Sequence, residues 1–242
     1  MKAFRMIFML CMMGIAGGAV AQPPASTLEE RLFTAIDEGK ELVAEGVLTR
    51  GRVNLDARNA QGETALHRAV EKHMKELVEA LVKAGASVRA RSTSGETVLH
   101  IAALHADPSL TAFLLRAGAD PKARNDDGEA PLNWAALSGN VLVARLLLEN
   151  GGDANLADIR GNRPLHAAAD SGSMDMVRLI LSRTADPKAK NREGMSPEDV
   201  AKERNRPDVA QVLSKAVARP PTQSGSTNFG TVDIDDQPKE RF

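Results

Sequence analysis

Apolar residues recur in groups along the middle of the chain, and within each group they are spaced as on one face of a helix. Four such groups alternate with polar segments: Leu77, Val78, Leu81 and Val82; Leu110, Phe113, Leu114 and Leu115; Val143, Leu146, Leu147 and Leu148; Met176, Leu179, Ile180 and Leu181. The spacing predicts four amphipathic helices whose apolar faces form a core and not a ligand pocket. One such unit cannot bury its face alone, so we expect neighbouring units to stack.

A glycine marks each unit at a constant interval of 33 residues, at Gly62, Gly95, Gly128, Gly161 and Gly194. A tetrad begins two positions after each glycine: Thr64-Ala65-Leu66-His67, Thr97-Val98-Leu99-His100, Ala130-Pro131-Leu132-Asn133, Arg163-Pro164-Leu165-His166 and Ser196-Pro197-Glu198-Asp199. The spacing within a unit predicts a hairpin-like turn before the glycine, a short helix from the tetrad, a break, and the second, apolar helix. Each unit is therefore predicted to contain two antiparallel helices.

The predicted breaks fall at His73, Ala106, Gly139, Gly172 and Asn205. Glycine, asparagine and histidine can take the left-handed backbone conformation that such a break requires, but alanine does so rarely. Asp107-Pro108 follows the exceptional Ala106, which indicates a locally altered turn. Proline is tolerated in the first turn of a helix, so we place Pro108 there.

The period and the tetrads closely resemble the ankyrin repeat. The resemblance implies an all-α solenoid of helix-turn-helix units with β-hairpin-like connecting turns, used as a binding scaffold. We divide the chain into a signal peptide (1–21), a short linker (22–27), a degenerate N-terminal repeat (28–58), four repeats (59–91, 92–124, 125–157 and 158–190), a degenerate C-terminal capping repeat (191–218) and a tail (219–242). The tail has little to bury, and its composition predicts disorder.

The N-terminus has the pattern of an export signal. Lys2 and Arg5 precede an apolar run over 6–20, and Ala19-Val20-Ala21 offers small residues to a signal peptidase. The run is shorter than a membrane-spanning helix needs, so we predict cleavage and a periplasmic location, with a retained anchor or a eukaryotic secretory route as alternatives. The sole cysteine, Cys11, lies inside this segment, which leaves the mature chain without thiols.

Charge gives little support for a nucleic-acid partner. Removing residues 1–21 takes away two positive charges and leaves 29 Lys and Arg against 32 Asp and Glu, a formal charge of −3. Nucleic-acid-binding domains are usually basic. We therefore expect a protein partner, no membrane span after cleavage of the signal, and a monomer when the protein is free.

Histidine is the first candidate for metal or acid–base chemistry, because His67, His100 and His166 occupy one repeat position. Successive repeats lie about 10 Å apart, whereas zinc requires nitrogens at about 2 Å. The ankyrin resemblance implies that these imidazoles hydrogen-bond the backbone of neighbouring turns and join the repeats. His73 and His105 are predicted to be isolated near helix ends, and we expect neither a metal nor a cofactor.

Motifs of enzymes are also lacking in the sequence. No serine lies in a Gly-x-Ser-x-Gly motif, no Gly-x-x-x-x-Gly-Lys-Thr loop occurs, and the carboxylates are dispersed without a paired arrangement. We therefore predict that the protein is not an enzyme.

Two hairpin columns are basic. One contains Arg58, Arg91, Arg124, Ala157 and Lys190, and the other contains Asp56, Arg89, Lys122, Asn155 and Lys188. Glu63, Glu96 and Glu129 follow three of the marker glycines and could lie beside three of the arginines. Two interpretations stay open: a self-neutralising ladder of weak surface ion pairs, or a charged edge that orients an acidic partner.

Trp134, the only tryptophan, follows its tetrad at the position of Arg68, Ile101 and Ala167 in sister repeats. The register points this column toward the concave side that ankyrin proteins present to partners. Aromatic residues occur there for packing, yet tryptophan is also enriched in binding hot spots. We assign to partner binding Trp134 and Arg68, the hairpin cations Arg58, Arg89, Arg91, Lys122 and Arg124, an apolar patch of Ile101, Leu104, Leu137 and Ser138, and a polar rim of Asp170 and Ser171.

The resemblance therefore implies an exported scaffold that binds a protein through its concave face and hairpin tips. One hypothesis is an immunity-like role, in which the scaffold inhibits an envelope enzyme or toxin. The alternative hypothesis is a periplasmic stress or envelope-maintenance scaffold that supports an antioxidant or other exported enzyme.

Overall fold

The computed structural model describes residues 27–217, which form twelve helices and no β-strand. The helices occur in pairs: α1 (Leu28–Asp37) with α2 (Glu41–Arg50), α3 (Ala65–Glu71) with α4 (Lys75–Lys83), α5 (Val98–Leu104) with α6 (Pro108–Arg116), α7 (Pro131–Ser138) with α8 (Val141–Glu149), α9 (Pro164–Ser171) with α10 (Met174–Leu181), and α11 (Pro197–Glu203) with α12 (Pro207–Ser214). The predicted all-α solenoid is confirmed. The predicted signal peptide, most of the linker and the tail lie outside the described residues.

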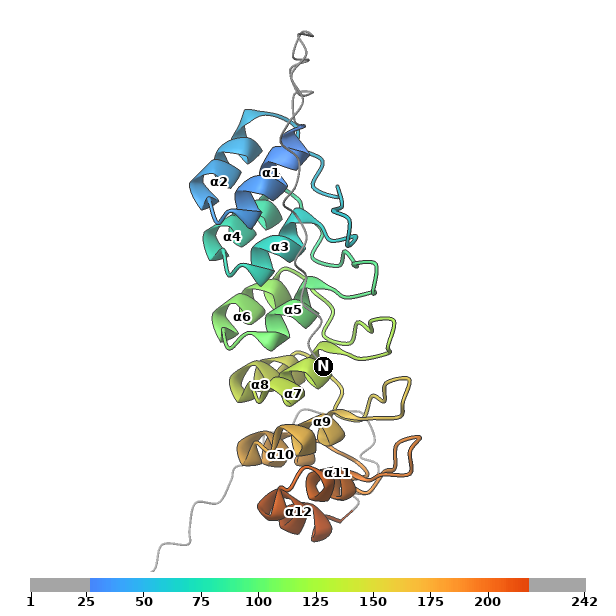
Figure 1. The fold of residues 1–242 in the computed structure, drawn as a ribbon. Helices are drawn as coiled ribbons and strands as arrows, with labels where there is room; N and C mark the ends of the chain where they lie inside the picture. Colours follow the sequence, from blue (N-terminus) through green and yellow to red (C-terminus); the bar gives the residue numbers. More distant parts are fainter. Residues whose placement is uncertain (1–26, 218–242) are drawn as a thin grey trace, which may run out of the picture.

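The pairs stack into one elongated array with two layers (Figure 1). The first helices form one layer, in which α1, α3, α5, α7, α9 and α11 each pack against the next. The second helices form the other layer, where α2 packs on α4 and α8 packs on both α6 and α10. The connecting hairpins all project from the same side of the stack. A column of equivalent residues therefore becomes a stripe along the molecule.

The core is built from small aliphatic residues that repeat with the helices. The tetrad leucines Leu66, Leu99, Leu132 and Leu165 are buried, and so are Leu77, Leu110, Val143 and Met176 of the second helices. Each group spans consecutive repeats, so the apolar face of one pair is covered by its neighbours. Within residues 27–217, no helix has the length and apolar character required to cross a membrane.

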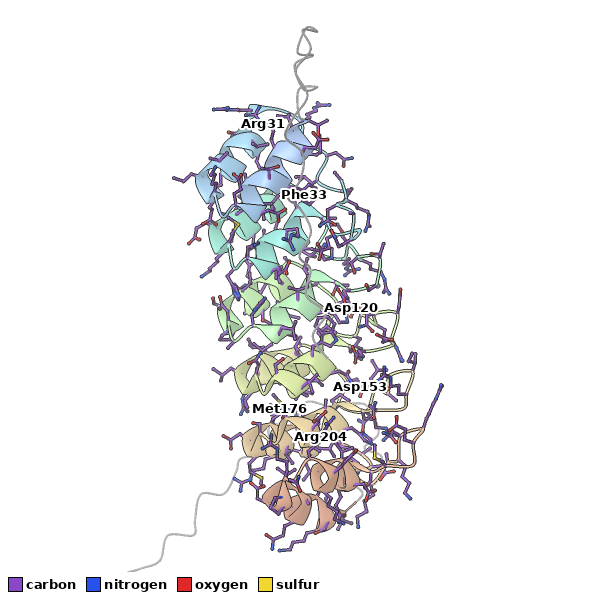
Figure 2. The ribbon with its side chains drawn as sticks, in the orientation of Figure 1. Arg31, Phe33, Asp120, Asp153, Met176 and Arg204 are labelled. Atoms are coloured by element: carbon purple, nitrogen blue, oxygen red, sulfur yellow. The ribbon has the colours of Figure 1, made fainter. Side chains whose placement is uncertain are left out.

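The turns that enter the hairpins are fixed by side chains that accept from the backbone two residues ahead. Asp120 accepts from the Lys122 N–H at 2.9 Å, and Asp153 accepts from the Asn155 N–H at 2.8 Å. Both carboxylates lie on the hairpin side of the stack in Figure 2. Such Asx turns replace a backbone hydrogen bond and set the direction in which each hairpin leaves its helix.

Gly62 illustrates why the marker position excludes side chains. Its φ is +70°, in the left-handed region, and a Cβ there would lie 2.8 Å from the backbone nitrogen of Thr93 in the next hairpin. Only glycine meets both requirements at low cost.

The break between the helices of a repeat is left-handed where the sequence predicts it. His73 and Asn205 have φ of 58° and 54°, and Gly139 and Gly172 also have positive φ. Ala106 does not adopt a positive φ. Asp107 instead caps α6 by accepting from the Ser109 N–H at 2.8 Å, and Pro108 is the first residue of that helix. The predicted altered turn is confirmed.

Candidate protein-interaction groove

A cavity of about 580 Å³ runs along the C-terminal half of the stack, on the side of the first helices. Its helical wall is formed by residues of α7, α9 and α11, and Leu104 at the end of α5 closes one end. The opposite wall comes from the hairpins that precede these helices. The cavity is therefore a groove between the first-helix layer and the hairpins, and several repeats contribute to it.

Trp134 on α7 lies in this groove in a fixed orientation. Its indole N–H donates a 2.7 Å hydrogen bond to the Glu129 carboxylate, and its ring packs in a T-shaped arrangement with the His100 imidazole, with 5.5 Å between the ring centroids. Leu104 and Leu137 line the groove beside it and are 45% and 53% exposed. A half-buried aromatic ring flanked by exposed leucines is a common composition for a binding hot spot.

The polar part of the lining is mostly acidic. Five carboxylates and two guanidinium groups line the groove: Glu129, Asp158, Asp170, Glu193 and Glu203, with Arg160 and Arg204. One ion pair forms between these carboxylates and guanidinium groups: Arg204 Nε lies 2.7 Å from an oxygen of Asp170. Arg204, labelled in Figure 2, directly follows α11, so this pair links α9 to the last repeat.

The repeated histidines contact backbone groups on both sides of the ring. His100 Nδ1 accepts from the Thr97 N–H at 3.1 Å, and Nε2 lies 3.0 Å from the Glu129 carbonyl oxygen in the next repeat. His67 and His166 repeat this arrangement, with Nε2 against the carbonyl oxygens of Glu96 and Met195. Burial lowers the pKa of all three, that of His100 to about 4. The neutral rings join successive repeats through hydrogen bonds.

The other two histidines correct the prediction that each is isolated. His73 and His105 pack edge to face, with ring centroids 3.8 Å apart. His73 ends the turn after α3, and His105 follows α5 in the next repeat, so the stacking brings them together. Across residues 27–217 there is no group of three or more His, Cys, Asp or Glu that could hold a metal ion.

Three overlapping segments of the sequence, residues 32–125, 99–191 and 132–223, each match the family described as ankyrin repeats (3 copies). The chain belongs to the ankyrin-repeat family. Ankyrin repeats are protein-interaction scaffolds that are generally not catalytic, and they imply a protein partner. A comparison with curated proteins found no match.

The hairpin arginines of this ankyrin stack form a ladder of hydrogen bonds to backbone carbonyl oxygens. Arg91 donates to the carbonyl oxygen of Arg124 at 2.7 Å, and Arg124 donates to the carbonyl oxygen of Ala157 at 2.7 Å. Arg58 makes the equivalent bond to the Arg91 carbonyl oxygen. In the part of the chain that the structure describes, these arginines form no ion pair with Glu63 or the equivalent glutamates, so of the two interpretations the Arg–Glu ladder is wrong. The orientation of an acidic partner by a charged edge stays a prediction.

Two further residues predicted to bind a partner already interact with other residues of the protein. Arg68 pairs with Asp37 at 2.7 Å and with Glu71, and Arg89 Nε donates to the carbonyl oxygen of Gly118 at 2.9 Å. Lys122 is exposed on its hairpin. The predicted cations therefore lie along the stack and outside the groove lining, and most of them hold neighbouring repeats together.

Some residues assigned to the apolar patch and its rim lie elsewhere. Ile101 is only 7% exposed and belongs to the core, which corrects its assignment to the surface patch. Ser138 is exposed but outside the groove lining, and Ser171 donates to the Ala168 carbonyl oxygen at 2.9 Å. Trp134, Leu104, Leu137 and Asp170 do meet in the groove.

The acidic hairpin residues of the groove were missed at the sequence level. Asp158 and Glu193 each lie one to three positions before a marker glycine, in columns that carry different residue types in other repeats. The column of Asp158 otherwise holds Asn or Ser, and the column of Glu193 mixes polar, acidic and basic residues, so neither column is acidic along the stack. Comparing which repeats carry acidic residues on both walls would have pointed to the C-terminal half.

Proposed function

We propose that this protein is an exported ankyrin scaffold that binds a single protein partner in the groove beside Trp134 and at the adjoining hairpin tips. The observation that carries the proposal is the meeting of the fixed indole with exposed Leu104 and Leu137 in one concavity. Exposed apolar residues that cluster in a concave site are more informative than scattered ones. A segment of a partner that covers these side chains would remove them from water.

The role we propose for the complex is inhibition, in the manner of an immunity protein that protects the cell from an envelope enzyme or toxin. The apolar run at 6–20 and the small residues at Ala19-Val20-Ala21 support export. Export itself is tested by fusing residues 1–21 to a reporter that is active only outside the cytoplasm. A cytoplasmic, inactive reporter would contradict it.

Partner binding is tested with a photo-crosslinking residue placed at Leu137 in the groove, and at Leu142 on the second-helix layer as a matched position. Leu142 is 63% exposed, so both sites reach solvent. Exposure to an extract of the source cells should give one dominant crosslinked protein from Leu137 and not from Leu142. Crosslinking only from Leu142 would place the partner on the other face and refute the groove.

Substitution provides the second arm of the same test. Leu137→Glu should abolish capture of that protein, whereas Leu142→Glu should leave it unchanged, and both variants retain the buried core. One stoichiometric partner whose activity falls on binding supports inhibition. Several substoichiometric partners whose activities do not fall would instead support the envelope-maintenance scaffold.

A further inference from the structure

The carboxylates of the groove are largely uncompensated. Asp158 accepts hydrogen bonds from the backbone N–H groups of Arg160 and Asn162, at 2.8 and 2.7 Å, but no cationic side chain pairs with it within residues 27–217. Exposed Glu193 and Glu203 likewise have no Lys or Arg partner in that range. Only Asp170 is neutralised, by Arg204.

This arrangement gives the groove a negative potential over an apolar floor. The unpaired carboxylates come from two hairpins and from α11, so they lie on both walls of the groove and not on a single element. Charge confined to a concave site acts more strongly on a bound group than the same charge on a flat surface. Two guanidinium groups, of Arg160 and Arg204, line the groove against five carboxylates, so a net negative charge remains. Arg124 does not offset it, because it lies outside the lining and donates to a backbone carbonyl.

The indole adds a second preference for a cation. Trp134 is held by Glu129 at one edge, so the ring and a carboxylate are adjacent in the groove. The face of a tryptophan attracts a Lys or Arg side chain, and a neighbouring carboxylate strengthens the attraction. The alkyl part of the same side chain packs on apolar surface, here supplied by Leu104 and Leu137.

We propose that the groove takes an extended, basic segment of a protein partner, with Lys or Arg on either side of an apolar anchor residue. The proposal rests on the proposed function, because it assigns the chemistry of the partner to the same groove. The groove reaches from α7 to α11, two repeat steps or about 20 Å. An extended chain rises about 3.3 Å per residue, so about six residues of the partner would lie in it.

The test uses the fluorescence of Trp134, because the chain contains one tryptophan and no tyrosine. Three synthetic peptides of equal length are titrated into the protein: one in which Lys alternates with Leu and Ser, and two in which every Lys is replaced by Gln or by Glu. The Lys peptide should shift the Trp134 emission and bind about tenfold or more tightly than the Gln peptide, with an affinity that falls as salt rises. The Glu peptide should not bind.

Two double variants distinguish the effect of charge inside the groove on peptide binding from the effect of the protein's net charge. The double variant Glu193→Gln with Glu203→Gln should bind the Lys peptide several-fold more weakly than the wild type. The control double variant, Glu79→Gln with Glu149→Gln on the second helices α4 and α8, should bind it as the wild type does. Equal binding of all three peptides, no binding of the Lys peptide, or equal effects of the two double variants would overturn the proposal. If a partner crosslinks from Leu137 but its crosslinked segment is acidic or uncharged, the proposed function stands and this inference fails. A crosslink to a second copy or to residues 218–242 refutes both.

Discussion

The indole nitrogen of Trp134 donates a 2.7 Å hydrogen bond to the carboxylate of Glu129, five residues earlier in the chain. This bond joins the hairpin wall of the groove to its helical wall. It also fixes the ring before any partner arrives, which lowers the entropy cost of binding.

Glu129→Ala should therefore free the indole without removing it. We expect lower steady-state anisotropy of the Trp134 fluorescence and a loss of about 1 kcal/mol in the free energy of unfolding, because a hydrogen bond to a partly exposed charged group is lost. Glu129→Gln keeps an oxygen acceptor and should retain most of the anisotropy. An unchanged anisotropy in the alanine variant would show that packing alone holds the ring.

Stability should fall as the solution is acidified below about pH 6.5. Burial lowers the pKa of His100 from 6.5 to about 4, so between these values the unfolded chain binds more protons than the folded one. The free energy of unfolding is then constant above this window and decreases through it, by up to about 3 kcal/mol from His100. Urea denaturation at a series of pH values measures the slope.

His100→Asn is the matched variant, because the equivalent Asn133 occupies that position in the next repeat. It should be less stable at pH 7.5, since the contact with the Glu129 carbonyl is lost, but its pH slope should be smaller. His67 and His166 will keep part of the slope, because their pKa values are lowered too. A slope equal to that of the wild type would rule out His100 as a contributor.

Each hydrogen bond of the arginine ladder should contribute separately to the free energy of unfolding. Arg124→Ala removes the 2.7 Å bond to the Ala157 carbonyl and should lower the free energy of unfolding by about 1 kcal/mol. Arg124→Lys should recover little, because an ammonium group lacks the planar fork of donors. Lys122→Ala in the same hairpin is the control and should change stability by less than about 0.5 kcal/mol. Equal losses at both positions would contradict the assignment.

The helix-break positions should respond differently to glycine. Asn205 has a positive φ, so Asn205→Gly should raise the free energy of unfolding by about 0.5 to 1 kcal/mol as strain is relieved. Ala106 lacks a positive φ, so Ala106→Gly should lower stability by increasing the entropy of the unfolded chain. Thermal denaturation of the pair measures both effects, and shifts of the same sign would refute the distinction.

The repeat architecture was predictable because it rests on local and periodic signals. The 33-residue interval, the apolar faces of the second helices and Pro108 at the start of α6 each reflect one unit and its stacking. The prediction for the Trp134 column was right for Trp134 and Ala167, which line the groove, but Ile101 of the same column is buried and Arg68 lies outside the lining. Asn140, by contrast, donates from the next repeat to the carbonyl oxygens of Ala103 and Leu104 at the end of α5, and nothing in the sequence marks those acceptors.

Side-chain periodicity was enough to predict the family, the number and order of the helices in the repeats and the apolar nature of the core. The stacking of the repeats was needed to show that the hairpin arginines donate to backbone carbonyls, that Ile101 is buried and that His73 meets His105. Every residue has a carbonyl group, so such an acceptor leaves no trace in the sequence. The acidic groove has the same origin, since its walls bring together residues of several repeats that the stacking alone places side by side.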